Sequence, residues 1–350
     1  MTYERNKLRK RALSKFIKKT IMSHTTLINK MSFHFKNSIS SWHILLIIIA
    51  LSSLNCKKNE FPPSEFEIGH IELGAAYDLC LEGSYAYVTC NEGMAIINIA
   101  DLNNPIHITT VSTDEAASGI LVENGIAFLG SGGNANCKII DVINKNNPIV
   151  LSSLFIPNPV TAFATNENTL FLSTWGGELY IIDISDLESP EIISSLDCQG
   201  IGTDLAYLDK TIFYANGHKG LQVIDVSDLN SPILNPTSVS YDPWDIDLKN
   251  DFLYLGRQNQ GFSIFEIEAD NTLSLVSSEN NGGETWGVSQ EGDKLFIADL
   301  QDGVETWDIS NKSQPTLMST IEEYSPHDIV VRNGYIFLAD QDRHFVILDI

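Results

Sequence analysis

Aromatic residues and acids recur together at a regular spacing in this sequence, and they are its best candidates for binding chemistry. Trp244, Trp286 and His327 are separated by 42 and 41 residues. The pair Tyr77-Asp78 has the same character near the start of the regular part of the chain. The complete candidate set comprises Tyr77, Asp78, Trp244, Asp245, Glu284, Trp286, His327 and Asp328.

Rings with acids beside them favour a sugar, a cationic group or a basic peptide as the ligand. A structural alternative is that the bulky residues only fill one side of a channel. A third interpretation is enzymatic, with His327 and Asp328 or Glu284 providing a general base in a hydrolase or lactonase-like enzyme. Because the sequence contains no G-x-S-x-G, H-E-x-x-H or Walker motif, non-enzymatic binding is the favoured prediction.

A repeat must position these side chains. A polar residue ends a run of apolar residues at intervals of 43, 42, 42, 41, 42 and 41 residues, and a proline follows in most copies. Seven copies at this regularity indicate a repeat architecture. The seven polar residues are Asn98, Asp141, Asp183, Asp225, Glu266, Asp308 and Asp349.

Each repeat consists of short runs rich in Val, Ile, Tyr and Phe, with Gly, Asn, Asp and Pro between them. Four strands in about 42 residues is the size of a propeller blade. The sequence therefore predicts an all-β protein, a seven-bladed β-propeller of four-stranded blades over residues 66–350. The segment FEIGHIEL at 66–73 has the character of a fourth strand, so the N-terminal strand should close the last blade.

The third-strand motifs LYIIDISDLESP at 179–190 and LQVIDVSDLNSP at 221–232 closely resemble the LVIVD repeat family of bacterial and archaeal surface proteins. The resemblance covers roughly 66–350. Repeats one to four and six carry it clearly, whereas repeat five has Glu266 and no proline. It implies a β-propeller and an extracytoplasmic binding or scaffold role, and it carries over no catalytic residue. The repeated Asp is expected to accept N–H bonds from the following turn.

First strands line the channel of a propeller, so the residues that begin them are the candidate ligand contacts. Four consecutive blades should offer Trp244, Trp286, His327 and Tyr77. The other three should offer the small pairs Ser118-Gly119, Thr161-Ala162 and Thr203-Asp204. The predicted site is therefore an asymmetric ring that is aromatic and acidic on one side.

The N-terminus reads as an export signal over residues 1–55, with Met31 as an alternative start. Ten Lys or Arg and one acid precede Cys56, and the apolar run WHILLIIIALSSL at 42–54 is too short to span a bilayer comfortably. A cysteine directly after such a segment resembles the lipobox of bacterial lipoproteins. We therefore expect a lipidated Cys56 and a tether over 56–65, placing the protein in the cell envelope, at the outer membrane or cell surface.

Charge excludes one class of partner. The chain carries a net charge of −23, and 44 of its 45 acids follow residue 55. A body this acidic repels the phosphate backbone, so nucleic acid is not expected as a partner. A membrane contact through the lipid and a protein or glycan partner are expected instead, with a scaffold role through the acidic rim as an alternative.

Metals and disulfides receive little support from the sequence. The cysteines have no zinc spacing, and Cys80 and Cys90 do not face each other in the predicted hairpin. No resident cofactor is predicted. Strand alternation places Asp245 and Asp247 on one face, where a calcium ion is conceivable, although solvated acids are the favoured interpretation.

Overall fold

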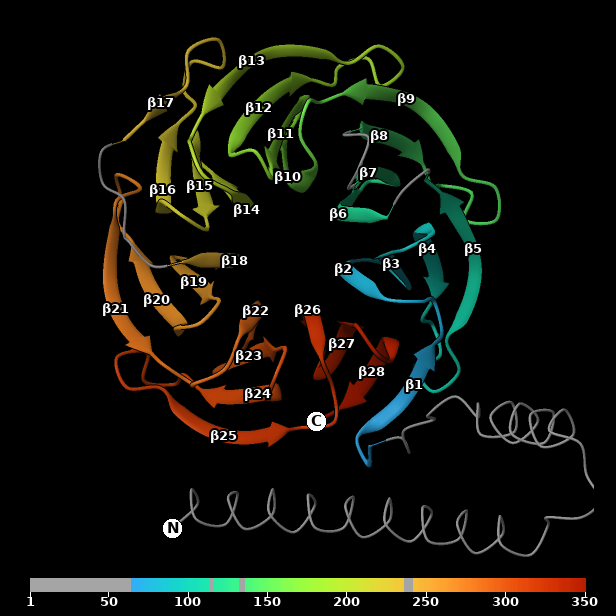
Figure 1. The fold of residues 1–350 in the computed structure, drawn as a ribbon, viewed down its shortest axis with the longest axis vertical. Helices are drawn as coiled ribbons and strands as arrows, with labels where there is room; N and C mark the ends of the chain where they lie inside the picture. The colour runs from blue at the N-terminus through green and yellow to red at the C-terminus, as the bar shows by residue number, and fades with distance from the viewer. Residues whose placement is uncertain (1–63, 114–115, 132–135, 236–241) are drawn as a thin grey trace, which may run out of the picture. The chain divides into compact units, whose positions relative to one another are not determined.

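The computed structural model describes residues 64–113, 116–131, 136–235 and 242–350. These residues form seven four-stranded antiparallel sheets around a central axis, and they contain no helix. Figure 1 shows the ring of blades viewed along this axis. The predicted all-β, seven-bladed propeller is confirmed.

Each blade contributes an innermost, a second, a third and an outer strand. The innermost strands are β2 (Ala76–Glu82), β6 (Ala117–Glu123), β10 (Val160–Asn166), β14 (Gly202–Leu208), β18 (Pro243–Lys249), β22 (Thr285–Glu291) and β26 (Pro326–Arg332). The second strands are β3 (Tyr85–Cys90), β7 (Ile126–Ser131), β11 (Thr169–Thr174), β15 (Thr211–Asn216), β19 (Phe252–Arg257), β23 (Lys294–Asp299) and β27 (Tyr335–Asp340). The third strands are β4 (Gly93–Asn98), β8 (Asn136–Asp141), β12 (Glu178–Asp183), β16 (Gly220–Asp225), β20 (Gly261–Ile267), β24 (Gly303–Asp308) and β28 (His344–Asp349). The outer strands are β5 (Ile106–Ser112), β9 (Ile149–Phe155), β13 (Glu191–Asp197), β17 (Ile233–Leu234), β21 (Leu273–Glu279), β25 (Thr316–Ile321) and β1 (Glu67–Ile71).

The first strand of the chain closes the ring. β1 pairs with β28, and the seventh sheet has the order β1-β28-β27-β26. Glu67 on β1 accepts hydrogen bonds from the Tyr324 hydroxyl and from Nη1 of Arg343, both at 3.0 Å. The predicted closure by the N-terminal strand is therefore confirmed, and buried polar contacts reinforce its ladder.

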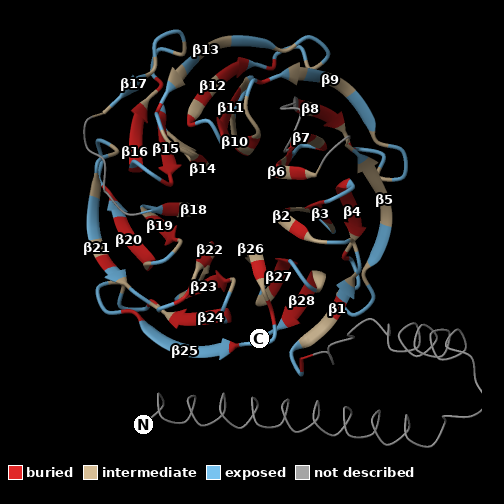
Figure 2. Ribbon diagram, viewed as in Figure 1, coloured by how far each residue is buried: buried red, intermediate tan, exposed pale blue. Residues whose placement is uncertain are grey.

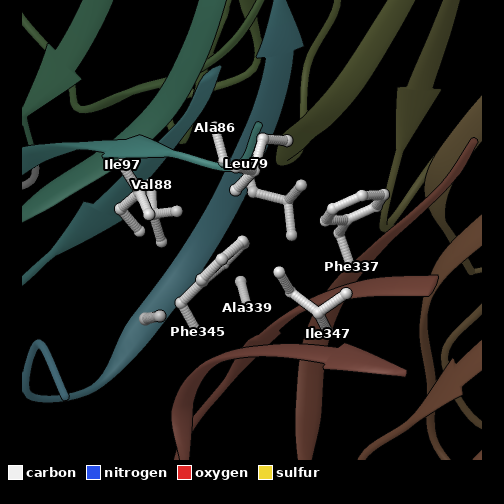
Figure 3. Close-up of a cluster of buried hydrophobic side chains, with 10 residues drawn as sticks. Leu79, Ala86, Val88, Ile97, Phe337, Ala339, Phe345 and Ile347 are labelled. Atoms are coloured by element: carbon white, nitrogen blue, oxygen red, sulfur yellow. The ribbon is translucent and has the colours of Figure 1, made fainter. Parts of the chain in front are cut away.

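Apolar side chains between the blades form the core. Second and third strands are buried on both faces, whereas the outer strands are mostly exposed, as Figure 2 shows. Figure 3 shows the junction between the last and first blades, where Phe337 and Phe345 pack with Leu79 and Val88. Burial on both faces explains why the third strands read as continuous apolar runs in the sequence.

The repeated polar residue at the end of the third strand caps the turn that follows it. Asp183 and Asp225 each accept the backbone N–H two residues later, both at 2.8 Å. Asn98, Asp141 and Asp308 make the same contact. The expected Asx turns are confirmed, so the feature that identifies the repeat serves the fold.

Several N-terminal predictions lie outside the described residues. These are the export signal at 1–55, the lipidated Cys56 and most of the tether at 56–65. Within the described ranges no helix is long and apolar enough to cross a membrane. The four cysteines in those ranges, Cys80, Cys90, Cys137 and Cys198, are free thiols.

Candidate functional site

A cavity of about 590 Å³ opens on the axis where the innermost strands begin. Its wall contains residues from all seven innermost strands, one residue just before each of β6 and β10, and one residue from a β-hairpin turn. The lining residues are Tyr77, Asp78, Ala116, Ala117, Ser118, Pro159, Thr161, Ala162, Trp175, Thr203, Asp204, Trp244, Asp245, Trp286, His327 and Asp328. The structure thus brings together seven of the eight candidate residues.

A β-bulge aims the second residue of each innermost strand at the axis. In β18, Pro243 pairs with Arg257 and Asp245 with Gly256, so Trp244 is left between two ladder partners. The register shifts at the same place in the other six innermost strands. Bulges commonly turn a side chain out of the pleat, which explains how one position of the repeat comes to face the cavity.

Five rings form a continuous arc along one side of the cavity, which we call the aromatic arc. Neighbouring ring centres are 6.0 Å apart from Trp175 to Trp244 and 4.7 Å from Trp244 to Trp286. They are 4.8 Å apart from Trp286 to His327 and 5.6 Å from His327 to Tyr77. The predicted asymmetry is therefore present, with rings on one side and small residues on the other.

Trp175 is the ring that the sequence analysis missed. It follows β11 in the turn to β12, and it reaches the arc from a blade whose innermost strand offers only small residues. Its side chain is 47% exposed. The only sequence signal is a tryptophan in a Gly-rich turn, Thr174-Trp175-Gly176-Gly177, which does not belong to the repeated positions we aligned.

Glu284 does not join the site. Its carboxylate accepts a hydrogen bond from Nε2 of Gln301 at 2.6 Å, and it is absent from the cavity wall. Because Glu284 lies just before β22, the bulge that turns Trp286 inward does not act on it. Proximity in sequence to Trp286 therefore misled the prediction.

The other side of the cavity uses hydroxyl groups to join neighbouring blades. Oγ of Ser118 donates to the carbonyl of Val160 at 2.6 Å. The hydroxyls of Thr161 and Thr203 donate to carbonyls of the next blades at 2.9 and 3.2 Å. These residues occupy the same repeat position as Tyr77, Trp244, Trp286 and His327. At this position, blades two to four therefore have a hydrogen bond to the next blade where the other blades have an aromatic ring.

The cavity aspartates also join the blades. Each aspartate is the third residue of its innermost strand. Its carboxylate accepts the N–H of the fourth residue of the innermost strand in the next blade, at 2.6 to 2.9 Å. These pairs of acceptor and donor are Asp78 with Ile120, Asp204 with Ile246, Asp245 with Val288 and Asp328 with Leu79. The acids that the sequence offered as ligand contacts thus have a structural role.

Electrostatically, the four aspartates behave as two pairs. Removal from bulk water, followed by the nearby Asp328 charge, raises the pKa of Asp78 well above its usual range. Removal from bulk water, followed by the Asp204 charge, likewise raises the pKa of Asp245. Burial also raises the pKa of Asp204, to about 6. These raised pKa values favour the protonated forms of Asp78 and Asp245, so the cavity is less negative than four ordinary carboxylates would make it.

His327 is held by rings. Tyr77 and Trp286 both contact it edge-on, and burial lowers the pKa of the imidazole. Among the described residues, no carboxylate accepts a hydrogen bond from its ring nitrogens. Both oxygens of Asp328 accept backbone N–H groups, from Leu79 and Ile329. The arrangement presents a neutral imidazole at the cavity.

One donor in the cavity wall has no partner. Nε1 of Trp286 is buried and makes no hydrogen bond to the described part of the protein. A buried polar group without a partner carries a free-energy penalty of about 1–3 kcal/mol. Because Nε1 has almost no accessible surface, an acceptor in the cavity would reach it only after the ring turns.

Asp245 and Asp247 share a face, as strand alternation predicted. Asp245 accepts the N–H of Val288, and Asp247 accepts that of Gln290 at 2.6 Å and lies 3.6 Å from Nζ of Lys249. In each aspartate, the oxygen that accepts this N–H faces the next blade. Among the described residues, no group of three or more His, Cys, Asp or Glu side chains is arranged to hold a metal ion.

Comparison with known proteins addresses the repeat directly. The model of the LVIVD repeat matches residues 73–113, 164–198, 203–238, 282–322 and 325–350. The chain belongs to the LVIVD repeat family. The matched segments cover repeats one, three, four, six and seven. They omit the divergent fifth repeat and also the second, which the sequence motif places among the clear copies. No curated protein matches the chain.

Solved structures similar to this LVIVD repeat protein share its fold at low identity. The β-propeller domain of Cps50 (Swd1) from Myceliophteria thermophila is 11% identical, with a TM-score of 0.67 and coverage of 81% of this chain and 99% of that one. A functionally unknown protein from Desulfotomaculum acetoxidans DSM 771 is 15% identical, with a TM-score of 0.62 and coverage of 72% and 87%. The computationally designed Ika8 protein is 13% identical, with a TM-score of 0.60 and coverage of 79% and 83%. At these identities the likeness concerns the fold alone.

Proposed function

We propose that this LVIVD repeat protein is a non-enzymatic recognition protein of the cell envelope. In this proposal, lipid on Cys56 holds it to a membrane, and the aromatic arc of the axial cavity binds a glycan. The observation that carries the binding role is the difference between equivalent positions around the ring. Ser118, Thr161 and Thr203 donate hydrogen bonds to the next blade. Among the described residues, the rings at the same position in the other blades make no such hydrogen bond and contact one another around the cavity instead.

The chemistry of the aromatic arc favours a sugar over a cation as the ligand. Flat rings pack well against the apolar face of a pyranose, while the hydroxyl groups at its edge need donors and acceptors. Nε1 of Trp286 is a buried donor with no partner among the described residues. The raised pKa values of Asp78 and Asp245 favour their protonated forms, which makes the wall less negative than four ordinary carboxylates. A basic peptide would find few full charges to pair with.

Tryptophan fluorescence tests the binding site. Three of the five tryptophans of the chain lie in the cavity, so a panel of neutral oligosaccharides should change their emission on binding. The double variant Trp244→Ala, Trp286→Ala should lose this response with a nearly unchanged melting temperature. Phe155→Ala is the control, because Phe155 is 71% exposed on the outer strand β9 and should bind like the wild type.

Three results would count against the proposal. Equal binding by the double variant would remove the aromatic arc from recognition. A polypeptide partner that is released by the same double variant, with no response to any sugar, would replace the glycan by a protein. Hydrolysis of esters, lactones or glycosides that disappears in His327→Ala would make the protein an enzyme.

The lipid anchor needs its own test in the native host. Cells fed an alkyne-bearing fatty acid should label the wild-type protein and not the Cys56→Ala variant, which should be released in soluble form. Protease added to intact cells and to permeabilised cells then distinguishes the cell surface from the periplasm. An unlabelled wild-type protein would refute the anchor without affecting the cavity.

A further inference from the structure

A second cavity lies at the opposite ends of the innermost strands, between the last and first blades. Its volume is about 350 Å³. One wall comes from β26, β27 and the turn between them, and the other from the β2–β3 turn and the residues after β4. The lining residues are Gly83, Ser84, Ile99, Ala100, Leu102, Arg332, Asn333, Tyr335 and Phe337.

At two of the equivalent junctions a glutamate fills this place. At the end of β22, Glu291 accepts the N–H groups of Asn333 and Gly334 in the next blade's turn, at 2.6 and 2.8 Å. At the end of β2, Glu82 accepts the N–H of Gly125 in the same way, at 2.9 Å. A glutamate carboxylate thus joins two of the blade junctions on this face.

At the junction between the last and first blades the residue in that position is Arg332. The turn it faces is Gly83-Ser84, equivalent to Asn333-Gly334. A guanidinium group has no acceptor for a backbone N–H. Within the described residues, the amide groups of Gly83 and Ser84 have no hydrogen-bond acceptor.

Arg332 is itself without an acidic partner. No carboxylate of the described residues lies within salt-bridge distance of it, although the chain holds 45 acids. Its guanidinium lies 5.7 Å from the centre of the Phe337 ring, and the side chain is only partly exposed. Burial lowers the pKa of this guanidinium. It therefore remains a partly desolvated cation whose five N–H donors are unused by the protein.

We propose that this second cavity binds a carboxylate ligand with an apolar substituent, in which the carboxylate takes the place that Glu82 and Glu291 fill at two other junctions. One oxygen would accept the N–H groups of the Gly83-Ser84 turn, and Arg332 would donate to the carboxylate. Ile99, Leu102 and Phe337 would contact the apolar part. The proposal is independent of the glycan site, since the two cavities lie at opposite ends of the innermost strands.

A carboxylate is favoured over a phosphate because a carboxylate closes two of the other six junctions, those of Glu82 and Glu291. The spacing between blade and turn at those two junctions is that of a carboxylate. The group could belong to a small organic acid or to the end of a polypeptide, and both sources present the same chemistry.

Isothermal titration of the full chain tests this with 3-phenylpropionate and its amide. The acid should bind, and the neutral amide should bind at least about tenfold more weakly, because charged hydrogen bonds are the stronger ones. A tripeptide ending in a free Phe carboxylate, compared with the amidated tripeptide, identifies a polypeptide end as the better source if it binds more tightly than 3-phenylpropionate. Equal binding of acid and amide, no binding of either acid, or tighter binding of inorganic phosphate would each overturn the proposal.

Variants at one repeat position complete the test. Arg332→Glu should abolish binding of the acid and keep or raise the melting temperature, since the new glutamate can accept the turn N–H groups as Glu291 does. Arg332→Gln provides a neutral variant that should also bind at least about tenfold more weakly. The control is Lys249→Gln, at the equivalent position of β18, which should bind normally. Undiminished binding by either Arg332 variant would refute the site.

Discussion

Replacing Asp204 by Asn should stabilise the propeller at neutral pH and have little effect in acid. In the folded protein, burial raises the pKa of Asp204 to about 6 from an ordinary value of 3.8. The unfolded chain releases this proton near pH 3.8, while the folded chain keeps it until about pH 6. The free energy of unfolding therefore falls as pH rises through this window, and above it the penalty is complete.

The structure sets the size of the effect. A shift from 3.8 to about 6 corresponds to roughly 3 kcal/mol at about 1.4 kcal/mol per pKa unit. Because Asp204 also faces the cavity, water there screens part of this penalty, and we expect a gain of about 1–3 kcal/mol. An Asn side chain keeps an oxygen for the N–H of Ile246 and offers an N–H to Asp245, so the geometry of the junction survives.

Urea unfolding at pH 4.0 and pH 7.5 measures this directly. Asp204→Asn should unfold at higher urea than the wild type at pH 7.5 and at nearly the same urea at pH 4.0. Asp225→Asn is the matched control on the same blade, since Asp225 is only partly buried and its turn contacts lower its pKa. The reasoning is refuted if Asp204→Asn is less stable at pH 7.5, or if its gain is equal at both pH values.

Three other perturbations have expected outcomes. Glu67→Ala should reduce the free energy of unfolding by about 3–5 kcal/mol, because it removes the buried carboxylate that accepts hydrogen bonds from Tyr324 and Arg343; chemical denaturation checks it. Gly303→Ala should lower the free energy of unfolding by about 2 kcal/mol or more, since the φ of Gly303 is 91° and an added Cβ would lie 2.0 Å from a carbonyl oxygen. Gly334→Ala should lower the free energy of unfolding by less in the same assay, since Gly334 has a φ of 78° but open space around an added Cβ. Trp175→Ala should weaken oligosaccharide binding in fluorescence titrations and leave the melting temperature unchanged.

The repeat made most of the fold predictable. Blade number, strand count, closure by β1 and the Asx turns all follow from one pattern with a period of about 42 residues, because seven copies average out local ambiguity. Two-residue turns such as Asn333-Gly334, where Asn333 has φ of 57°, mark the hairpins independently. A local pattern and a repeated one therefore pointed to the same architecture.

The site was predictable only where it coincided with the repeat. Trp244, Trp286, His327 and Tyr77 share one aligned position, so a shared bulge places them together. Trp175 enters from a turn that the alignment did not cover, and only the closeness of blades in space brings it to the arc. Arg332 became informative only after the glutamates at equivalent positions were seen to join neighbouring blades.

Comparison of equivalent positions also decides between structural and binding roles. An aspartate beside a ring suggests a ligand contact in the sequence, yet Asp78, Asp204, Asp245 and Asp328 all accept a backbone N–H from the next blade. The other three blades have Gly or Ala at the position of these aspartates, so a single junction can form without this contact. The aromatic residues differ from the aspartates. They occupy a position where the other blades use hydroxyl groups to hydrogen-bond the next blade. Side chains that replace a hydrogen bond between blades and gather in a continuous arc on a cavity are the candidates for ligand contact. In a repeat protein, departures from the shared pattern are therefore the places to look for function.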